Sequence, residues 1–394
     1  MFYIENKITL DPIAEIASLI AKDNRENIMN LCLGYFESEI NKTTGFTVLN
    51  SPNASIIDEE NIDFSILGEN TFRREIASLL SIQTSNQYYQ SVVQTIGASG
   101  GIWLIFSILK RFEQCRRVWF SSPTWGNHIE IAKNTNLDFS YYHYSLNENG
   151  ELDFELMLKS ISRMESGDIL LIQGCCHNPL GVDLSLEQWE IVAILAKDKK
   201  VSVVVDFAYM GLANGIEQDK NVLLPLYKHL DYFFVVNSFS KSLGLYGERL
   251  GTLTCFAKDN KIVEGFEIYA KQIVRSTYSM PPQNIAKKVA KVIGSKTLAT
   301  IWYEELTQLS NSLHLRKKAL LEALFEVGLD KLVTNQNSNG MFINLNLTTL
   351  EISELAKKYA IYILTNGRLS LACLQLVDIS RLVEALKMIK YYQE

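Results

Sequence analysis

The sequence lacks several features that would assign it to a class of protein at once. Its 394 residues contain six cysteines, none of them in a CxxC pair: Cys32, Cys115, Cys175, Cys176, Cys255 and Cys373. We therefore expect small buried thiols in a reducing compartment, and no metal site. The formal net charge of −6 offers no basic surface for nucleic acid, which excludes that class of partner.

Long apolar runs are also absent. No run reaches the length of a membrane-spanning helix, and the start, MFYIENKITLDP, lacks the basic residues and apolar core of a signal peptide. Apolar residues make up 47% of the chain and charged residues 21%, as in an ordinary globular protein. These observations predict a soluble cytoplasmic protein that has no membrane partner.

Short apolar runs recur through the middle of the chain, each followed by a turn and a helical pattern. They are RVWFSSP (117–123), DILLIQG (168–174), VSVVVDFAY (201–209), YFFVVNSFS (232–240) and LGTLTCFA (250–257). Their continuous apolar content is typical of strands buried on both faces. Between two of them, residues 185–200 begin with a Ser185…Gln188 capping box and continue with helical periodicity. The pattern predicts an α/β fold with a mostly parallel central sheet flanked by helices.

The pattern changes after about residue 300. A long amphipathic stretch at 304–328 leads to alternating short strand-like and helical segments that end at residue 394. We interpret this part as a smaller α+β domain, with which the first ~40 residues pack. The predicted division is a large domain of residues 44–308 and a small domain made of residues 1–43 and 309–394.

Polar residues follow several of the predicted strands. Asp206 ends the run VSVVV, Asn178 follows the run DILLIQG, and Lys241 follows the run YFFVV. Each has an ordinary explanation when taken alone: a structural salt bridge, a turn residue and a solvated lysine. Their joint occurrence at successive strand ends favours a binding site, because ligands collect at the carboxyl ends of parallel strands.

Two features predict that this site binds an anion. The stretch TIGASGG (95–101) precedes a helical run, so free backbone N–H groups and the Ser99 hydroxyl lie at a helix N-terminus. Arg249, eight residues after Lys241, and the hydroxyls of Ser238 and Ser240 add a charge-assisted clamp. A phosphate site, an acid, an aromatic residue and a lysine together describe a site for pyridoxal phosphate.

The stretch SFSKSLGLYGERLG (238–251) resembles the lysine motif of the class I-alpha aminotransferases, the aspartate and aromatic group of fold-type I pyridoxal phosphate enzymes. Other segments resemble this family in the same order: SPTWGNH (122–128), CCHNPLGVD (175–183), VVVDFAYMG (203–211), VRSTYSMPP (274–282), NGMFINL (339–345) and GRLSLACL (367–374). The similarity spans roughly residues 30 to 390. It implies a fold-type I transferase that uses pyridoxal phosphate.

The resemblance assigns cofactor roles to particular residues. Lys241 binds the cofactor covalently and then moves the proton, Asp206 pairs with the pyridine nitrogen, and Tyr209 completes the catalytic set. His128 supports Asp206 from behind, and Trp125 stacks on the ring. Tyr209 and Asn178 donate to the phenolic oxygen of the ring. The phosphate is held by Ser99, Ser238, Ser240, Arg249 and the backbone of Ala98.

The resemblance also assigns substrate roles. Arg368 resembles the arginine that binds the α-carboxylate, and Arg275 resembles the arginine that reaches a side-chain carboxylate from the neighbouring subunit, which implies a homodimer. Leu33 and Gly34 resemble the segment that closes over the substrate, and Trp125 and Asn178 also contact it. The implied substrates are an acidic or aromatic L-amino acid and a 2-oxo acid such as 2-oxoglutarate.

Three residues depart from the family pattern. Gly97 replaces a serine of the phosphate loop, Asp63 stands where a tyrosine reaches the phosphate, and Met280 replaces a small polar residue beside Arg275. These changes leave open an altered substrate choice and a specialised biosynthetic role. Two alternatives remain: a lyase, decarboxylase or oxidase that uses the same cofactor, and a non-catalytic binding protein that kept the fold.

Overall fold

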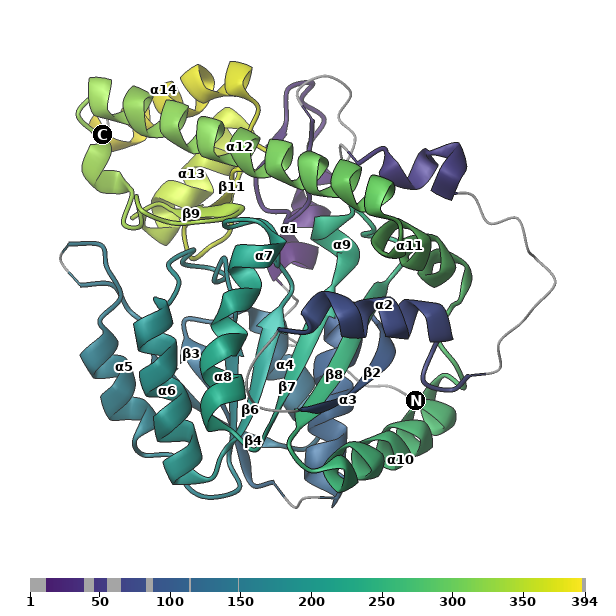
Figure 1. The fold of residues 1–394 in the computed structure, drawn as a ribbon. Coiled ribbons are helices and arrows are strands. Elements are labelled where there is room, and N and C mark those ends of the chain that lie inside the picture. The colour runs from purple at the N-terminus through teal and green to yellow at the C-terminus, as the bar shows by residue number, and fades with distance from the viewer. Residues whose placement is uncertain are drawn as a thin grey trace, which may run out of the picture.

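A seven-stranded sheet lies at the centre of the molecule (Figure 1), as seen in a computed structural model that describes residues 12–38, 46–54, 65–82, 88–112, 115–147 and 149–391. The strand order is β2 (Tyr89–Ile96), β8 (Leu250–Ala257), β7 (Tyr232–Ser238), β6 (Ser202–Phe207), β5 (Ile169–Gln173), β3 (Arg117–Ser122) and β4 (Asp138–His143). Only β8 runs antiparallel to its neighbours, β2 and β7. The predicted fold class, a mostly parallel sheet flanked by helices, is confirmed.

The central strands are buried on both faces, as their apolar runs predict. Every residue of β5 and β6 is buried, and successive side chains of β6 alternate between two cores. Val203 and Val205 pack in one core, while Val204 packs in the other. The five predicted strands are all present. Two further strands of this sheet, β2 and β4, were not predicted, because polar residues interrupt β2 and because the edge strand β4 is largely exposed.

Helices cover both faces of this sheet (Figure 1). Residues of the first core come from α2 (Asn70–Leu80), α5 (Phe154–Ile161), α6 (Leu186–Lys199), α7 (Ile216–Asp219), α8 (Leu223–His229) and α11 (Asn284–Gly294). Residues of the second core come from α3 (Gly97–Phe112), α4 (Gly126–Asn134) and α10 (Asn260–Thr277). The predicted capping box starts α6: the Ser185 hydroxyl accepts from the Gln188 amide at 3.2 Å, and the Gln188 side chain accepts from the Ser185 amide at 2.9 Å.

The C-terminal unit, residues 327–391, lies above the sheet and is joined to it by the long helix α12 (Lys296–Glu326) (Figure 1). It contains β9 (Phe342–Asn344), α13 (Thr349–Tyr359), β10 (Ile361–Tyr362), β11 (Arg368–Ser370) and α14 (Ile379–Tyr391). β11 pairs antiparallel with β9. β10 pairs in parallel with β1 (Met29–Asn30), so a segment from the start of the chain completes this unit. The exact domain boundaries stay a prediction.

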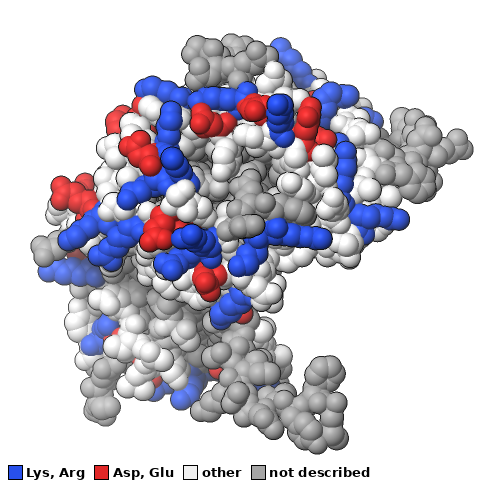
Figure 2. All heavy atoms as spheres, turned by 90° about the horizontal axis from the view of Figure 1, so that it is seen from below, with Lys and Arg blue, Asp and Glu red and all other residues white. Residues whose placement is uncertain are grey.

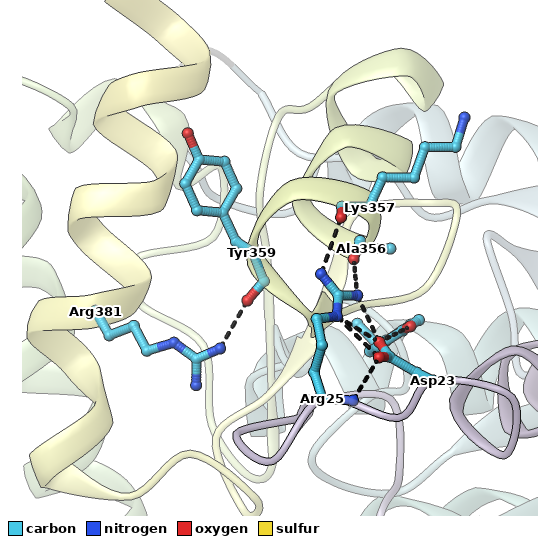
Figure 3. A network of polar contacts seen from close by, with 7 residues as sticks. Asp23, Arg25, Ala356, Lys357, Tyr359 and Arg381 are labelled. Carbon is cyan, nitrogen blue, oxygen red and sulfur yellow. Dashed lines mark hydrogen bonds and ion pairs between the residues drawn. The ribbon is translucent and has the colours of Figure 1, made fainter.

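Polar contacts also attach residues 23–25, which follow α1 (Pro12–Ile20), to the C-terminal unit (Figure 3). The Arg25 guanidinium donates to the carbonyl oxygens of Ala356 at 2.7 Å and Lys357 at 2.9 Å. Both residues belong to the last turn of α13. Asp23 accepts from Arg25 Nε at 2.8 Å, and this contact together with the Tyr362 hydroxyl holds the pKa of Asp23 below its ordinary value. Arg25 therefore satisfies carbonyl groups that every helix leaves unpaired at its C-terminus.

Lysine and arginine side chains spread over the face of the molecule seen from below, interleaved with acidic ones (Figure 2). The parallel strands begin at this edge of the sheet, where Arg116 lies 3.6 Å from Glu165 and Lys258 lies 3.1 Å from Asp231. Such exposed pairs contribute little to stability. Among the helices that the structure describes, none combines the length and apolarity needed to cross a membrane.

Candidate active site

A cavity of about 290 Å³ opens at the carboxyl ends of β5, β6 and β7, beneath the C-terminal unit. This is the edge where a parallel sheet binds its ligands. Most of the predicted site residues line it: Leu33, Gly34, Ala98, Ser99, Trp125, Asn178, Asp206, Tyr209, Ser238, Ser240, Lys241, Arg249 and Arg368. Residues far apart in the sequence therefore meet around one space.

Lys241 lies in the short helix α9 (Phe239–Ser242), directly after β7. The pKa of its ammonium group is lowered to about 8, mainly because burial disfavours the charge; Asp206 opposes this shift, and the cationic groups of Arg249 and Arg368 add to it. Its Nζ atom lies 5.1 Å from the centroid of the Tyr209 ring. A lysine that is partly neutral near pH 7 can attack a carbonyl carbon.

Asp206, the next-to-last residue of β6, has a buried carboxylate that two groups orient. Its Oδ1 accepts from the Ala208 amide at 3.0 Å, and its Oδ2 lies 3.1 Å from Nε2 of His128. His128 is itself buried at the start of α4, where its Nδ1 lies 2.9 Å from the Thr124 hydroxyl. His128 does not line the cavity itself but lies behind Asp206, where it fixes the acid from the protein side.

Trp125 and Tyr209 provide aromatic walls. Trp125 precedes α4, and its ring meets the His128 ring edge-on with centroids 5.1 Å apart. Tyr209 is 6% exposed, and burial raises the pKa of its hydroxyl above the ordinary value. The Tyr209 hydroxyl therefore stays protonated at neutral pH and can donate a hydrogen bond into the cavity.

One end of the cavity is built for an anion. The N-terminal turn of α3 contributes Ala98 and Ser99, and Arg249 Nη1 donates to the Ser240 hydroxyl at 3.0 Å. Gly97 has a φ of +70°, and a Cβ atom there would lie 2.3 Å from Nη2 of Arg249. The absence of a side chain at Gly97 therefore leaves room for the guanidinium against the helix N-terminus.

The opposite end is formed by Arg368 in β11. Its Nη1 donates to Asn178 Oδ1 at 2.9 Å, its Nη2 donates to the Cys32 carbonyl at 2.7 Å, and the guanidinium lies 4.0 Å from the centroid of Phe342. Its buried Nε has no hydrogen-bond partner among the described residues. Burial lowers the pKa of the guanidinium from its ordinary value. An unsatisfied cationic donor on a cavity wall is suited to a carboxylate.

Arg275 and Met280, two of the positions that the family resemblance singled out, do not line this cavity. Arg275 is exposed in the last turn of α10, where its guanidinium donates to the Ser279 hydroxyl. Met280 follows it in a half-buried position. Within one chain neither residue lines the cavity, so the role of Arg275 in a neighbouring subunit stays a prediction. Asp63 lies outside the described residues.

The sequence analysis missed several residues that line the cavity: Ile13, Tyr35, Gln173, Ala208, Tyr246 and Phe342. Tyr246 and Phe342 stand inside motifs that were recognised, but only chemically reactive residues were taken from those motifs. The position of Gln173 at the last residue of β5 was a usable signal, because the other strand ends supply site residues.

Comparison with known proteins decides the family. The sequence profile of aminotransferase class I and II matches residues 26–386. The aspartate aminotransferase of Escherichia coli (strain K12) is 31% identical over 384 residues, covering 95% of this chain and 96% of the relative. The chain belongs to the aminotransferase class I and II family. The aromatic-amino-acid aminotransferase of the same E. coli strain is 28% identical over 385 residues, again with 95% and 96% coverage.

Solved aminotransferase structures agree with this assignment. An aromatic amino acid aminotransferase from Burkholderia cenocepacia J2315 superposes with a TM-score of 0.90 at 27% identity, covering 100% of both chains. An aromatic-amino-acid aminotransferase from Burkholderia pseudomallei, covalently bound to pyridoxal phosphate, superposes with a TM-score of 0.88 at 25% identity, covering 98% of this chain and 100% of the other. The predictions of a class I aminotransferase of fold type I, and of pyridoxal phosphate as its cofactor, are confirmed.

The residues of this aminotransferase fit that cofactor. The α3 N-terminus with Arg249 matches a phosphate dianion, and the buried Asp206 matches a protonated ring nitrogen. Lys241, with its lowered pKa, lines the same cavity. The chemistry of each donor therefore corresponds to a different part of one molecule.

Proposed function

We propose that this aminotransferase moves an amino group between an acidic or aromatic L-amino acid and a 2-oxo acid, with 2-oxoglutarate as the acceptor. One observation carries the proposal: a half-buried lysine of lowered pKa lies in one cavity with an oriented carboxylate and a guanidinium whose Nε is unpaired among the described residues. The names of the relatives, aspartate and aromatic-amino-acid aminotransferases, support the two substrate classes.

Each residue then has a definite task. When bound, pyridoxal phosphate withdraws electrons from the amino acid and so makes the Cα proton acidic. Lys241 Nζ would hold the cofactor covalently and afterwards take and return that proton. Asp206 would keep the ring nitrogen charged, because a buried carboxylate oriented by His128 favours a proton on its partner. Arg368 would bind the α-carboxylate through the donors that the protein leaves unpaired.

Asn178 has a restricted role in this arrangement. Its Oδ1 accepts from Arg368, so the Nδ2 group is the part of the amide left to donate into the cavity. The same contact ties the substrate arginine to a residue beside the cofactor. We propose that Asn178 and Tyr209 both donate to the phenolic oxygen of the ring.

We also propose that two chains form a homodimer in which Arg275 of one subunit reaches the cavity of the other. Its exposed position, outside the cavity of its own chain, supports this assignment. A cytoplasmic location is supported by the six cysteines, which are all buried and form no disulfide.

The test is a half-reaction followed through cofactor absorption. Addition of glutamate, aspartate, phenylalanine or tyrosine alone should convert bound pyridoxal phosphate to pyridoxamine phosphate, and 2-oxoglutarate should reverse the change. Release of ammonia or carbon dioxide without pyridoxamine phosphate would instead support a lyase or decarboxylase. Failure of borohydride to trap the cofactor on Lys241 would support a non-catalytic protein.

A further inference from the structure

The segment of residues 31–37 contributes Leu33, Gly34 and Tyr35 to one wall of the cavity, and both of its ends are attached to the C-terminal unit. At one end, the Ser370 amide donates to the Leu31 carbonyl at 2.8 Å, and at the other the Glu37 amide donates to the Ala372 carbonyl at 2.9 Å. Two hydrogen bonds at opposite ends fix the backbone of this segment to the C-terminal unit. The wall therefore follows any movement of that unit.

A buried arginine strengthens this attachment. Arg316, fully buried in α12, donates through Nη1 to the carbonyl oxygens of Leu371 at 3.1 Å and Ala372 at 2.7 Å, and through Nη2 to the Glu37 carbonyl. Its guanidinium also lies 4.8 Å from the centroid of the Phe36 ring. Arg316 therefore bridges residues 31–37 and the C-terminal unit, in addition to the backbone hydrogen bonds between them.

Only one hydrogen bond in the described part of the chain links residues 31–37 to the layer that contains the central sheet. The Phe36 amide donates to the Tyr246 hydroxyl at 3.1 Å. The Tyr246 ring also meets the Tyr35 ring edge-on, with centroids 6.1 Å apart. Tyr246 lines the cavity itself, so the contact lies where the two layers meet at the cavity.

Tyr246 is connected in turn to the anion end of the site. It lies five residues after Lys241, and its carbonyl accepts from Arg249 Nη1 at 3.1 Å. The same Nη1 donates to the Ser240 hydroxyl. A continuous path of hydrogen bonds therefore runs from the phosphate end of the cavity, through Tyr246, to the wall that faces the substrate.

We propose that Tyr246 is a positioning residue that holds the 31–37 wall closed over the amino acid substrate. The proposal rests on the proposed function, because it concerns the same cavity and the same bound amino acid. Without the hydroxyl, the Phe36 amide loses its acceptor, and the wall loses its hydrogen bond to the layer that contains the central sheet. Loss of one such hydrogen bond should lower the equilibrium constant for closing the wall by about fivefold.

The test compares Tyr246→Phe with Tyr88→Phe, a matched control whose hydroxyl donates to the Leu230 carbonyl away from the cavity. The ligand is an amino acid methylated at Cα, which binds but has no Cα proton to lose, and its affinity is read from cofactor absorption. Tyr246→Phe should raise the dissociation constant about fivefold and leave the spectrum of the ligand-free enzyme unchanged. Tyr88→Phe should leave the dissociation constant unchanged.

Amide hydrogen exchange gives a second readout that does not depend on activity. In the wild-type enzyme, the methylated ligand should slow exchange at Phe36, and Tyr246→Phe should speed it several-fold while the Glu37 amide, bonded to Ala372, stays protected. An unchanged ligand dissociation constant, or equal exchange at Phe36 in both proteins, would overturn the proposal. Absence of the half-reaction in wild-type protein would instead reject the proposed function.

Discussion

The lowered pKa of Lys241 makes a quantitative prediction about how the apoprotein captures its cofactor. Only the neutral amine attacks the aldehyde, so the rate follows the neutral fraction. With a pKa of about 8, roughly 9% of the side chain is neutral at pH 7, compared with about 0.03% for a lysine at 10.5. Capture at pH 7 should therefore be about 300-fold faster than by an ordinary lysine in the same place.

The signs of the charge contributions give two opposite shifts. Asp206 raises the pKa of Lys241, so Asp206→Asn should move the midpoint of the pH–rate curve below 8. Arg368 lowers that pKa, so Arg368→Gln should move the midpoint upward. Stopped-flow absorption measurements of pyridoxal phosphate capture by the apoprotein between pH 6.5 and ~10.5 would measure all three curves, over the range in which lysine titrates. A wild-type midpoint near 10.5, or shifts of the two variants in the same direction, would refute the reasoning.

Two further predictions concern the subunit arrangement and the anion end. Inactive Lys241→Ala protein mixed with an equal amount of Arg275→Ala protein should regain about a quarter of the wild-type activity toward dicarboxylates after the subunits exchange. The reason is that about half of the dimers are then mixed, and half of the sites in a mixed dimer are intact. No recovery would mean that Arg275 acts in its own chain. Gly97→Ala should weaken cofactor binding about tenfold by displacing Arg249, as loss of a charge-assisted contact does. The control, Gly167→Ala, has a similar positive φ of +88° but an open Cβ position, so it should bind cofactor normally; equal affinities of the two variants would contradict this reading.

The cofactor half of the site could be predicted because its residues stand at the ends of strands. Asp206 and Lys241 follow apolar runs that form β6 and β7, and parallel strands bring their carboxyl ends together without further information. The sheet itself was predicted for the same reason, apart from β2 and β4, whose exposed and polar residues obscure the pattern.

The substrate half depends on contacts that no local pattern contains. Phe36 meets Tyr246 across 210 positions of sequence, and Cys32 meets Arg368 across 336. Such pairs arise from how the C-terminal unit packs over the sheet, which periodicity and propensity do not determine. The resemblance to a family identified Arg368, but it did not identify Tyr35 or Tyr246 as parts of the wall.

The two halves of the cavity also differ in where they lie along the chain. Every residue assigned to the phosphate and the ring belongs to residues 98–249, whereas the wall above the substrate comes from residues 13–35 and 342–368. Under the proposed function, we expect mutations in those outer segments to alter which amino acid is accepted without disturbing the residues that hold the cofactor. An ancestral enzyme of this shape could therefore acquire new substrates gradually, each intermediate remaining an active catalyst.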